Sequence, residues 1–188
     1  MEYRTFDVEG PIEISPRKIE DERGYFSEIF RLDSFVERAE RVEFVQHNQS
    51  LSIRPGTVRG LHFQTQPAAQ GKLVCCLAGR LIDFAVDLRH GSSTFGRWIS
   101  ATLSFEQCNQ LWVPVGFAHG FCTLEPNTVI SYRVTDYYSP ENDKGVVWDD
   151  PSIAIDWPDI ADPQTLSAKD RNQPRLADLP AYFTMGEK

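Results

Sequence analysis

Two histidines, an arginine and a lysine occur in short segments whose other residues are mostly apolar. Arg59 and His62 bound the sequence Arg-Gly-Leu-His, Lys72 opens an apolar run, and His119 lies in Pro-Val-Gly-Phe-Ala-His-Gly-Phe at 114–121. Because burying an unpaired charge is costly, ionisable groups in such segments indicate a functional site. Histidine moves protons near neutral pH. The pattern therefore favours acid–base chemistry on a small ligand.

The spacing Pro-x-Gly-x-x-His that ends at His119 resembles the second half of a cupin metal motif. The first half is missing, because Gln64 stands where a metal-binding cupin supplies a second histidine after His62. We therefore expect no metal site and no cofactor, and a metal-dependent cupin isomerase or dioxygenase is the alternative. His62 is expected to share one strand face with Gly60 and Gln64. An inward polar face in a small barrel is typical of a ligand cavity.

Three further features each allow a structural and a functional interpretation. Lys72, at the start of its strand, either extends its charge into solvent or places it in the cavity. Tyr132 is either a core tyrosine whose hydroxyl bonds the backbone or a proton donor. The segment 23–28, Arg-Gly-Tyr-Phe-Ser-Glu, is either a plain hairpin or a site for a phosphate and a stacked ring.

The composition is that of an ordinary globular protein. The chain has 188 residues, 41% of them hydrophobic and 24% charged, with a formal net charge of −8. These values predict one domain over residues 1–188, and nucleic acid and anionic membranes are not expected partners. The N-terminal residues lack the apolar core of a signal peptide, and the longest apolar runs are too short to span a bilayer. Four cysteines without a Cys-x-x-Cys pair are expected to be reduced thiols, so the expected location is the cytoplasm.

Short strand patterns dominate the chain, with Gly, Pro or Asn between them. They predict an all-β fold, a cupin-type jelly-roll barrel or sandwich with short peripheral helices. One helix is predicted at Asp33–Ala39, capped by Asp33 or Ser34, and a short second one near Pro163–Ala168. The expected strands are Val42–Leu51, Lys72–Leu77, Arg80–Leu88, Arg97–Leu103, Gln110–Val113, Phe117–Leu124 and Thr128–Thr135.

Both ends of the chain are expected to be extended. The tail from Asp149 onward contains five prolines, which predict that it wraps the barrel without forming a second domain. The N-terminal stretch Tyr3–Arg17 is predicted to pair with the sheet edge of another subunit.

Taken together, these segments resemble the dTDP-4-dehydrorhamnose 3,5-epimerase family, cupin-fold enzymes of nucleotide-sugar biosynthesis. The resemblance runs in order over nearly the whole chain, and RGLH together with PxGFAHGF is highly specific. It implies a homodimeric jelly roll without a metal that acts on dTDP-4-dehydro-6-deoxyglucose. The matching segments are 21–26, 46–50, 59–64, 70–74, 83–89, 114–121, 132–138, 148–151 and 166–170.

The resemblance also implies the roles of four catalytic residues. His62 is the base, and Asp170 is the carboxylate that orients it. Lys72 stabilises an enolate, and Tyr132 is the acid on the opposite face of the sugar. The C4 ketone of the substrate acidifies the protons on C3 and C5, because either carbanion delocalises as an enolate. Relatives that invert only C3 or only C5, or that take another dTDP-keto-sugar, share these residues and are the alternative.

A second set of positions matches those that hold the nucleotide diphosphate and the sugar. At Asp143 the chain departs from the family, which has glutamate after the Tyr-Tyr-x-Pro segment. A non-catalytic sugar-binding cupin would not need the histidine, lysine and tyrosine together. The expected binding residues are Arg23, Phe26, Glu28, Gln46, Asn48, Arg59, His119, Asp143 and Lys169.

Overall fold

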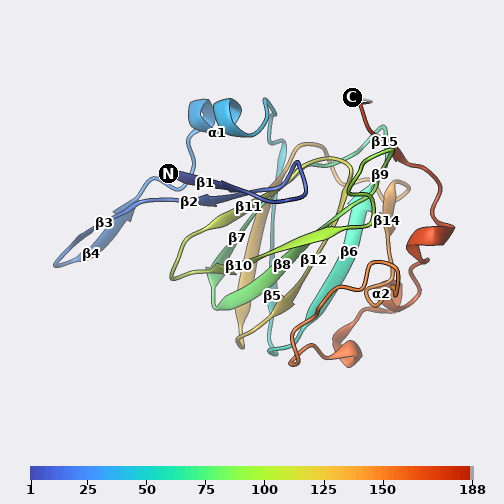
Figure 1. The fold of residues 1–188 in the computed structure, drawn as a ribbon. Helices are drawn as coiled ribbons and strands as arrows, with labels where there is room; N and C mark the ends of the chain where they lie inside the picture. The colour runs from blue at the N-terminus through green and yellow to red at the C-terminus, as the bar shows by residue number, and fades with distance from the viewer. Residues whose placement is uncertain (187–188) are drawn as a thin grey trace.

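Two antiparallel sheets face one another in the computed structural model, which describes residues 1–186 (Figure 1). The larger sheet has the order β1 (Glu2–Thr5), β2 (Ile12–Ser15), β11 (Gln110–Val113), β7 (Lys72–Ala78), β13 (Thr128–Val134) and β5 (Gln46–Ser52). The smaller sheet has the order β10 (Trp98–Ser104), β8 (Arg80–Asp87), β12 (Phe117–Thr123), β6 (Val58–Gln64) and β14 (Asp143–Gly145). Consecutive strands alternate between the two sheets from β5 to β8 and from β10 to β14. The predicted all-β jelly roll is confirmed.

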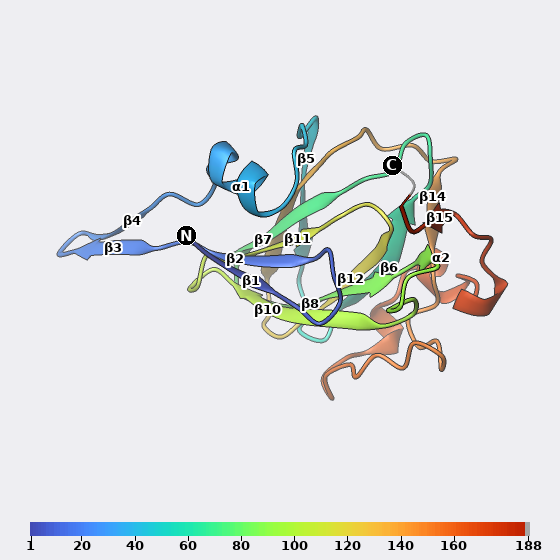
Figure 2. The same cartoon turned by 45° about the horizontal axis from the view of Figure 1, so that its top comes forward.

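Short elements surround these sheets. β3 (Lys18–Asp21) and β4 (Gly24–Ser27) form a hairpin that projects away from both sheets, as Figures 1 and 2 show from two directions. β9 (Arg89–His90) and β15 (Phe183–Thr184) pair in parallel. The helices are α1 (Leu32–Arg38) and α2 (Ala168–Arg171), with 3₁₀ turns at Pro163–Thr165 and Leu176–Asp178. Among residues 1–186, no helix is long and apolar enough to cross a membrane.

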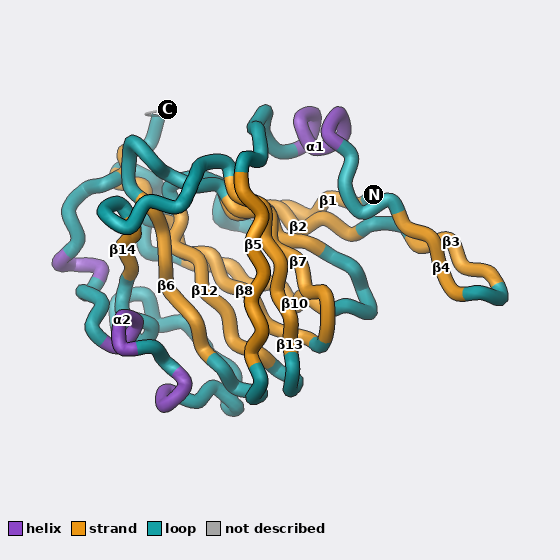
Figure 3. The backbone as a smooth tube through the Cα atoms, turned by 180° about the vertical axis from the view of Figure 1, so that it is seen from behind, coloured by secondary structure: helices purple, strands orange, loops and turns teal. Residues whose placement is uncertain are grey.

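Apolar side chains fill one end of the space between the two sheets. Val74 and Ile130 of the larger sheet belong to one buried cluster with Ala85 and Phe121 of the smaller sheet. Side chains along a strand alternate between its faces, so the inward residues build this core. Polar residues gather at the other end, near β5, β6 and β14. Figure 3 shows α2 on the same side of the molecule as β14.

The outer face of each sheet is covered in part. Phe35 of α1 packs edge-on against Trp112 of the larger sheet, with ring centroids 5.2 Å apart. On the smaller sheet, Trp157 of the C-terminal tail packs against Phe84, with centroids 4.6 Å apart. The proline-rich tail therefore wraps the barrel, as predicted from its composition.

Helix α1 begins one residue earlier than predicted, at Leu32. Neither Asp33 nor Ser34 caps it, because Arg31 is the N-cap residue and makes no side-chain cap. The Asp33 carboxylate instead accepts hydrogen bonds from the Arg31 guanidinium at 2.8 Å and from the Ser34 backbone N–H at 2.7 Å. Ionic contacts between neighbouring side chains thus replace the expected cap.

Other predicted elements also differ, and several strands end one residue earlier or later than predicted. Residues 42–45 precede β5 because Phe44 packs on Phe35 and Trp112, with centroids 5.8 and 6.1 Å away. The helix predicted at 163–168 is split, because Ser167 is extended and its hydroxyl caps the separate helix α2. The N-terminal stretch pairs through β2 with β11, and β1 is the outermost strand of this sheet, so its pairing with another subunit stays a prediction.

A β-bulge in β6 determines which side chains face the space between the sheets. His62 pairs with His119 and Arg59 pairs with Phe121, so two residues of β6 lie opposite the single residue Gly120. In a regular strand, residues three apart point to opposite faces. The bulge therefore brings Arg59 and His62 to one cavity. The predicted alternation holds for His62 and Gln64, which both line that cavity, and is wrong for Gly60.

Replacing Gly60 by alanine should destabilise the fold by about 3 kcal/mol or more. Gly60 has φ +119°, and an added Cβ would lie 2.5 Å from Gly120 Cα and 2.8 Å from the His119 carbonyl oxygen. Gly24 is the matched control, because its φ is +130° but nothing lies within 4 Å of its added Cβ. Thermal unfolding of both variants checks the prediction, and an equal loss of stability in the two would contradict it.

Candidate active site

A cavity of about 500 Å³ opens between the sheets at their polar end. It lies where β5, β6 and β13 approach β14 and the segment around α2. Its lining residues are Gln46, Asn48, Ser50, Arg59, His62, Phe63, Gln64, Gln70, Lys72, His119, Phe121, Tyr132, Tyr138, Asp143, Ser167, Lys169 and Asp170. Ten of the thirteen predicted site residues are in this set, although they come from seven different elements.

His62 and Asp170 form a hydrogen-bonded pair in the cavity. The His62 Nε2 atom lies 2.5 Å from Asp170 Oδ1, and the Asp170 side chain is 5% exposed. The Ser167 hydroxyl accepts the Asp170 backbone N–H at 3.1 Å, which begins helix α2 and holds Asp170 against His62. Burial raises the pKa of Asp170, but hydrogen bonds from His62 and Ser167 outweigh it and leave the pKa below its usual value. The pair is a histidine oriented by an ionised carboxylate.

Lys72 is buried with its ammonium group in the cavity. Its Nζ atom donates a hydrogen bond to the His62 carbonyl oxygen at 3.2 Å. Burial lowers the pKa of Lys72 to about 8, while the charges of Asp143 and Asp83 oppose that change. At pH 7 the ammonium form therefore prevails. Of the two sequence interpretations, the structure rules out a lysine that extends into solvent.

Tyr132 lies on β13 where the apolar core meets the cavity. Its ring packs against the core cluster, and its side chain also lines the cavity. Burial raises the pKa of the Tyr132 hydroxyl, with a further increase from the charge of Asp143 and a decrease from Arg59. A phenol that stays protonated near neutral pH is able to donate a proton.

Polar residues of β5 and β6 form one wall of the cavity mouth. Gln46 donates to Asn48 Oδ1 at 2.8 Å, so the two amides orient each other. The Arg59 guanidinium donates to Ser52 Oγ at 3.2 Å and to the Leu51 carbonyl oxygen at 3.1 Å. These contacts fix the guanidinium at the rim.

The opposite wall comes from β14 and α2. Lys169 forms an ion pair with Asp143, and the Tyr138 hydroxyl donates to the same carboxylate at 3.0 Å. Asp143, where the sequence departs from the family that it resembles, therefore lies within the cavity. His119 lies deeper, with its Nε2 atom 2.7 Å from the buried carboxylate of Asp83.

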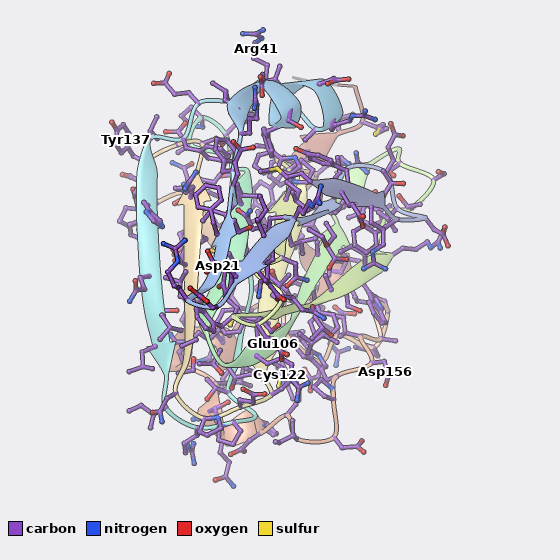
Figure 4. The ribbon with its side chains drawn as sticks, turned by 90° about the vertical axis from the view of Figure 1, so that its left-hand side faces the viewer. Asp21, Arg41, Glu106, Cys122, Tyr137 and Asp156 are labelled. Carbon is purple, nitrogen blue, oxygen red and sulfur yellow. The ribbon has the colours of Figure 1, made fainter. Side chains whose placement is uncertain are left out.

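Three predicted binding residues do not reach this cavity within the chain. Arg23 and Phe26 lie on the β3–β4 hairpin and Glu28 just beyond it; the Arg23 side chain is 84% exposed and pairs with Asp21 at 2.5 Å. Phe26 is 69% exposed. In Figure 4, where Asp21 is labelled, the hairpin points toward the viewer, away from the sheets. Within one chain, the predicted joint site of these residues with His62 is not formed.

Sequence reasoning missed the role of Gln64 and the position of Tyr138. The Gln64 amide donates to the carbonyl oxygens of Ala68 and Tyr137 at 2.6 and 3.0 Å, and it accepts the Ser139 N–H at 2.8 Å. It thereby clamps the turn that places Tyr138 at the cavity mouth. Its place after His62 was a signal for a non-metal role, but its partners are distant in sequence. Within residues 1–186, no three His, Cys, Asp or Glu side chains converge as metal ligands.

The arrangement suits proton transfer at a carbon next to a carbonyl group. A carboxylate-oriented histidine can remove the proton, a buried cation can stabilise the resulting oxyanion, and a phenol can return a proton. All three groups face one cavity, which is large enough for a sugar with part of a nucleotide.

Comparison with known proteins agrees with this chemistry. The sequence model of the family described as dTDP-4-dehydrorhamnose 3,5-epimerase matches residues 5–178. A protein of that name from Sinorhizobium fredii is 58% identical over 97% of this chain and 93% of its own length. A dTDP-4-dehydrorhamnose 3-epimerase from Streptomyces niveus is 36% identical over 98% of this chain and 91% of its length.

A solved structure from Legionella pneumophila, dTDP-6-deoxy-D-glucose-3,5-epimerase in complex with dTDP-4-keto-L-rhamnose, is similar throughout. It is 40% identical, with a TM-score of 0.91 over 100% of this chain and 99% of that chain. Since sequence and structure agree over nearly its whole length, the chain belongs to the dTDP-4-dehydrorhamnose 3,5-epimerase family of cupin-fold isomerases.

Proposed function

We propose that this protein converts dTDP-4-dehydro-6-deoxy-D-glucose into dTDP-4-dehydro-L-rhamnose by inverting C3 and C5. The observation that carries the proposal is the single cavity in which the His62–Asp170 pair, the buried Lys72 and Tyr132 meet. The similarity to an epimerase that was solved with dTDP-4-keto-L-rhamnose supports the substrate class.

Proton removal is the first step. The C4 ketone acidifies the hydrogen on each neighbouring carbon, and His62 takes that proton. Because Nε2 faces Asp170, Nδ1 is the nitrogen that is free to accept it. The electron pair of the broken C–H bond moves into the enolate, whose oxygen carries the negative charge. Lys72 is the cation that stabilises this oxygen.

Proton return completes each inversion. Tyr132 donates its hydroxyl proton to the carbon from the face opposite His62, and the enolate becomes a ketone again. Exchange with solvent then returns a proton to Tyr132 and removes one from His62. No electrons are gained or lost, so the step needs no redox partner. Repeating it at the second carbon gives the doubly inverted sugar.

The remaining cavity residues fit recognition of the nucleotide diphosphate and the sugar. Arg59 and Lys169 bring positive charge to the mouth, where a diphosphate would be placed. Gln46, Asn48 and Asp143 offer neutral and acceptor groups to sugar hydroxyls and to the nucleoside. This assignment follows the resemblance, and the shared cavity supports it.

The protein is proposed to act as a homodimer. The β3–β4 hairpin projects from the barrel with Phe26 69% and Ile19 60% exposed, and the outer face of the larger sheet leaves Leu51 50% exposed. β1 is the edge strand of the larger sheet, so pairing of the N-terminal stretch with the other subunit stays part of the proposal. We place the exchange of site residues at the projecting hairpin. Arg23 and Phe26, together with Glu28 just beyond it, would then complete the cavity of the partner.

Inversion at C3 alone is the second candidate, because a 3-epimerase shares 36% of this sequence over nearly its whole length. The full set of base, cation and acid favours double inversion. The cytoplasm remains our expected location, since all four cysteines are free thiols, as in a reducing compartment.

Deuterium incorporation tests the proposed reaction directly. In deuterium oxide, the native protein should place solvent deuterium at C3 and at C5 of the substrate, as followed by NMR. His62→Asn should abolish exchange at both carbons. Tyr132→Phe should retain exchange but form little inverted product, because the enolate forms and is reprotonated on its original face. Label at C3 alone would establish the 3-epimerase, and full inversion by Tyr132→Phe would place the acid elsewhere.

Replacing Lys72 by methionine should separate stability from activity. The pKa of Lys72 is lowered from 10.5 to about 8 in the folded protein, so the folded state binds this proton more weakly than the unfolded state. Its burial therefore costs about 3 kcal/mol at pH 7, and this cost declines as pH rises from about 8 to about 10.5. We expect Lys72→Met to raise the melting temperature at pH 7 and to lower kcat by about 10²–10³-fold.

Calorimetry and steady-state kinetics of Lys72→Met check this pair of effects. Lys144→Met is the control, because Lys144 bonds the Glu141 carbonyl oxygen outside the cavity. In the native protein, kcat should fall as pH rises through about 8, when Lys72 loses its proton. A less stable variant with native kcat would contradict both roles of Lys72.

Mixed dimers test the exchange of the hairpin. His62→Asn removes the base from the cavity, and Arg23→Ala with Phe26→Ala disables the hairpin, so each homodimer should be nearly inactive. Coexpression of the two chains should restore about a quarter of native activity, because half of the randomly formed dimers contain one intact site. No recovery in isolated mixed dimers would show that the hairpin does not act on the partner.

A further inference from the structure

Asp83 is a buried carboxylate that the proposed reaction does not use. It lies on β8 opposite Phe121 of β12, and its side chain is 0% exposed. Its Oδ1 atom lies 2.7 Å from His119 Nε2. Its Oδ2 atom is the one fully buried side-chain nitrogen or oxygen of residues 1–186 that has no hydrogen-bond partner. Such a group is costly to bury, so a purely structural role is a poor account of it.

A neighbouring carboxylate shows what a structural aspartate looks like in this protein. Asp87, four residues further along β8, is also buried, but it accepts hydrogen bonds from one guanidinium and two hydroxyl groups. Both oxygens of its carboxylate accept hydrogen bonds, and these contacts hold the turn that follows β8. Asp83 instead makes its one hydrogen bond to a residue that lines the cavity.

The contact with Asp83 determines what His119 offers to a ligand. An ionised carboxylate only accepts hydrogen bonds, so the hydrogen must be on Nε2. Lys72 lines the same cavity, and the charge of Asp83 is one of the two that raise the pKa of Lys72. His119 lines the cavity, and its Nε2 atom has the Asp83 carboxylate as partner, which leaves Nδ1 as the ring nitrogen available to a ligand.

We propose that Asp83 is a positioning residue that holds His119 in its Nε2–H tautomer, so that Nδ1 accepts a hydrogen bond from a hydroxyl group of the bound sugar. A lone pair repels the anionic oxygens of a diphosphate and attracts a hydroxyl hydrogen, which assigns His119 to the sugar and not to the phosphates. This inference rests on the proposed function for the identity of the sugar. The tautomer itself follows from the Asp83 contact alone.

NMR of ¹⁵N-histidine in the ligand-free native protein tests the tautomer without any variant. The protein has four histidines, and the spectrum of His119→Gln assigns the signal of interest. We expect a protonated Nε2 and an unprotonated Nδ1 at pH 7. Adding dTDP-glucose should shift the Nδ1 signal, whereas dTDP alone should not. A protonated Nδ1, or an equal response to both ligands, would overturn the proposal. An absence of epimerase activity would instead overturn only the proposed function.

Asp83→Asn supplies the kinetic test. An asparagine can donate its amide to Nε2 or accept from it through its carbonyl, so it no longer holds His119 in one tautomer. Replacing a histidine-orienting aspartate in serine proteases has such an effect. We expect kcat/KM to fall about 10- to 100-fold and dTDP affinity to be unchanged. Asp87→Asn is the matched control: it removes a buried carboxylate from the same strand but should leave the His119 signals unchanged. Weakened dTDP binding in Asp83→Asn, or a native kcat/KM, would overturn the assignment.

Discussion

Strands β6 and β12 approach each other so closely at Gly60 and Gly120 that neither position has room for a side chain. The resulting bulge sets His62 opposite His119 and turns Arg59 into the same space. Because β6 and β12 are central in the smaller sheet, this contact lies between the core and the open end of the barrel. The site described here is assembled around this contact.

In the part of the chain that the structure describes, three basic side chains of the cavity each contact a carboxylate, and Lys72 does not. His62 faces Asp170, His119 faces Asp83, and Lys169 faces Asp143, each within a direct contact. Lys72 has no carboxylate in direct contact among the described residues, and its Nζ atom bonds a carbonyl oxygen. Since an unneutralised buried cation attracts whatever negative charge enters, the cavity is prepared for an anion that forms only during reaction.

Local sequence patterns predicted the jelly roll, because alternation of apolar residues and turn residues is set within each strand. They also singled out His62, Lys72, His119 and Tyr132, whereas the other predicted cavity residues came from the resemblance to the family. What they could not predict depends on contacts between distant segments. The bulge at Gly60 needs the backbone of β12, and the contact of Asp83 with His119 joins residues 36 apart in the chain. The hairpin that carries Arg23 could be predicted from its local sequence. The direction in which it projects depends on how the whole chain packs.

Gln64 has a consequence for how this fold could evolve. In a metal-binding cupin the corresponding position holds a ligand, whereas here both ends of the amide are committed to the turn around Tyr138. A neutral histidine has one donor and one acceptor, so at this position it could not keep all three backbone partners of Gln64. The route back to a metal centre therefore passes through an intermediate with a loosened cavity mouth.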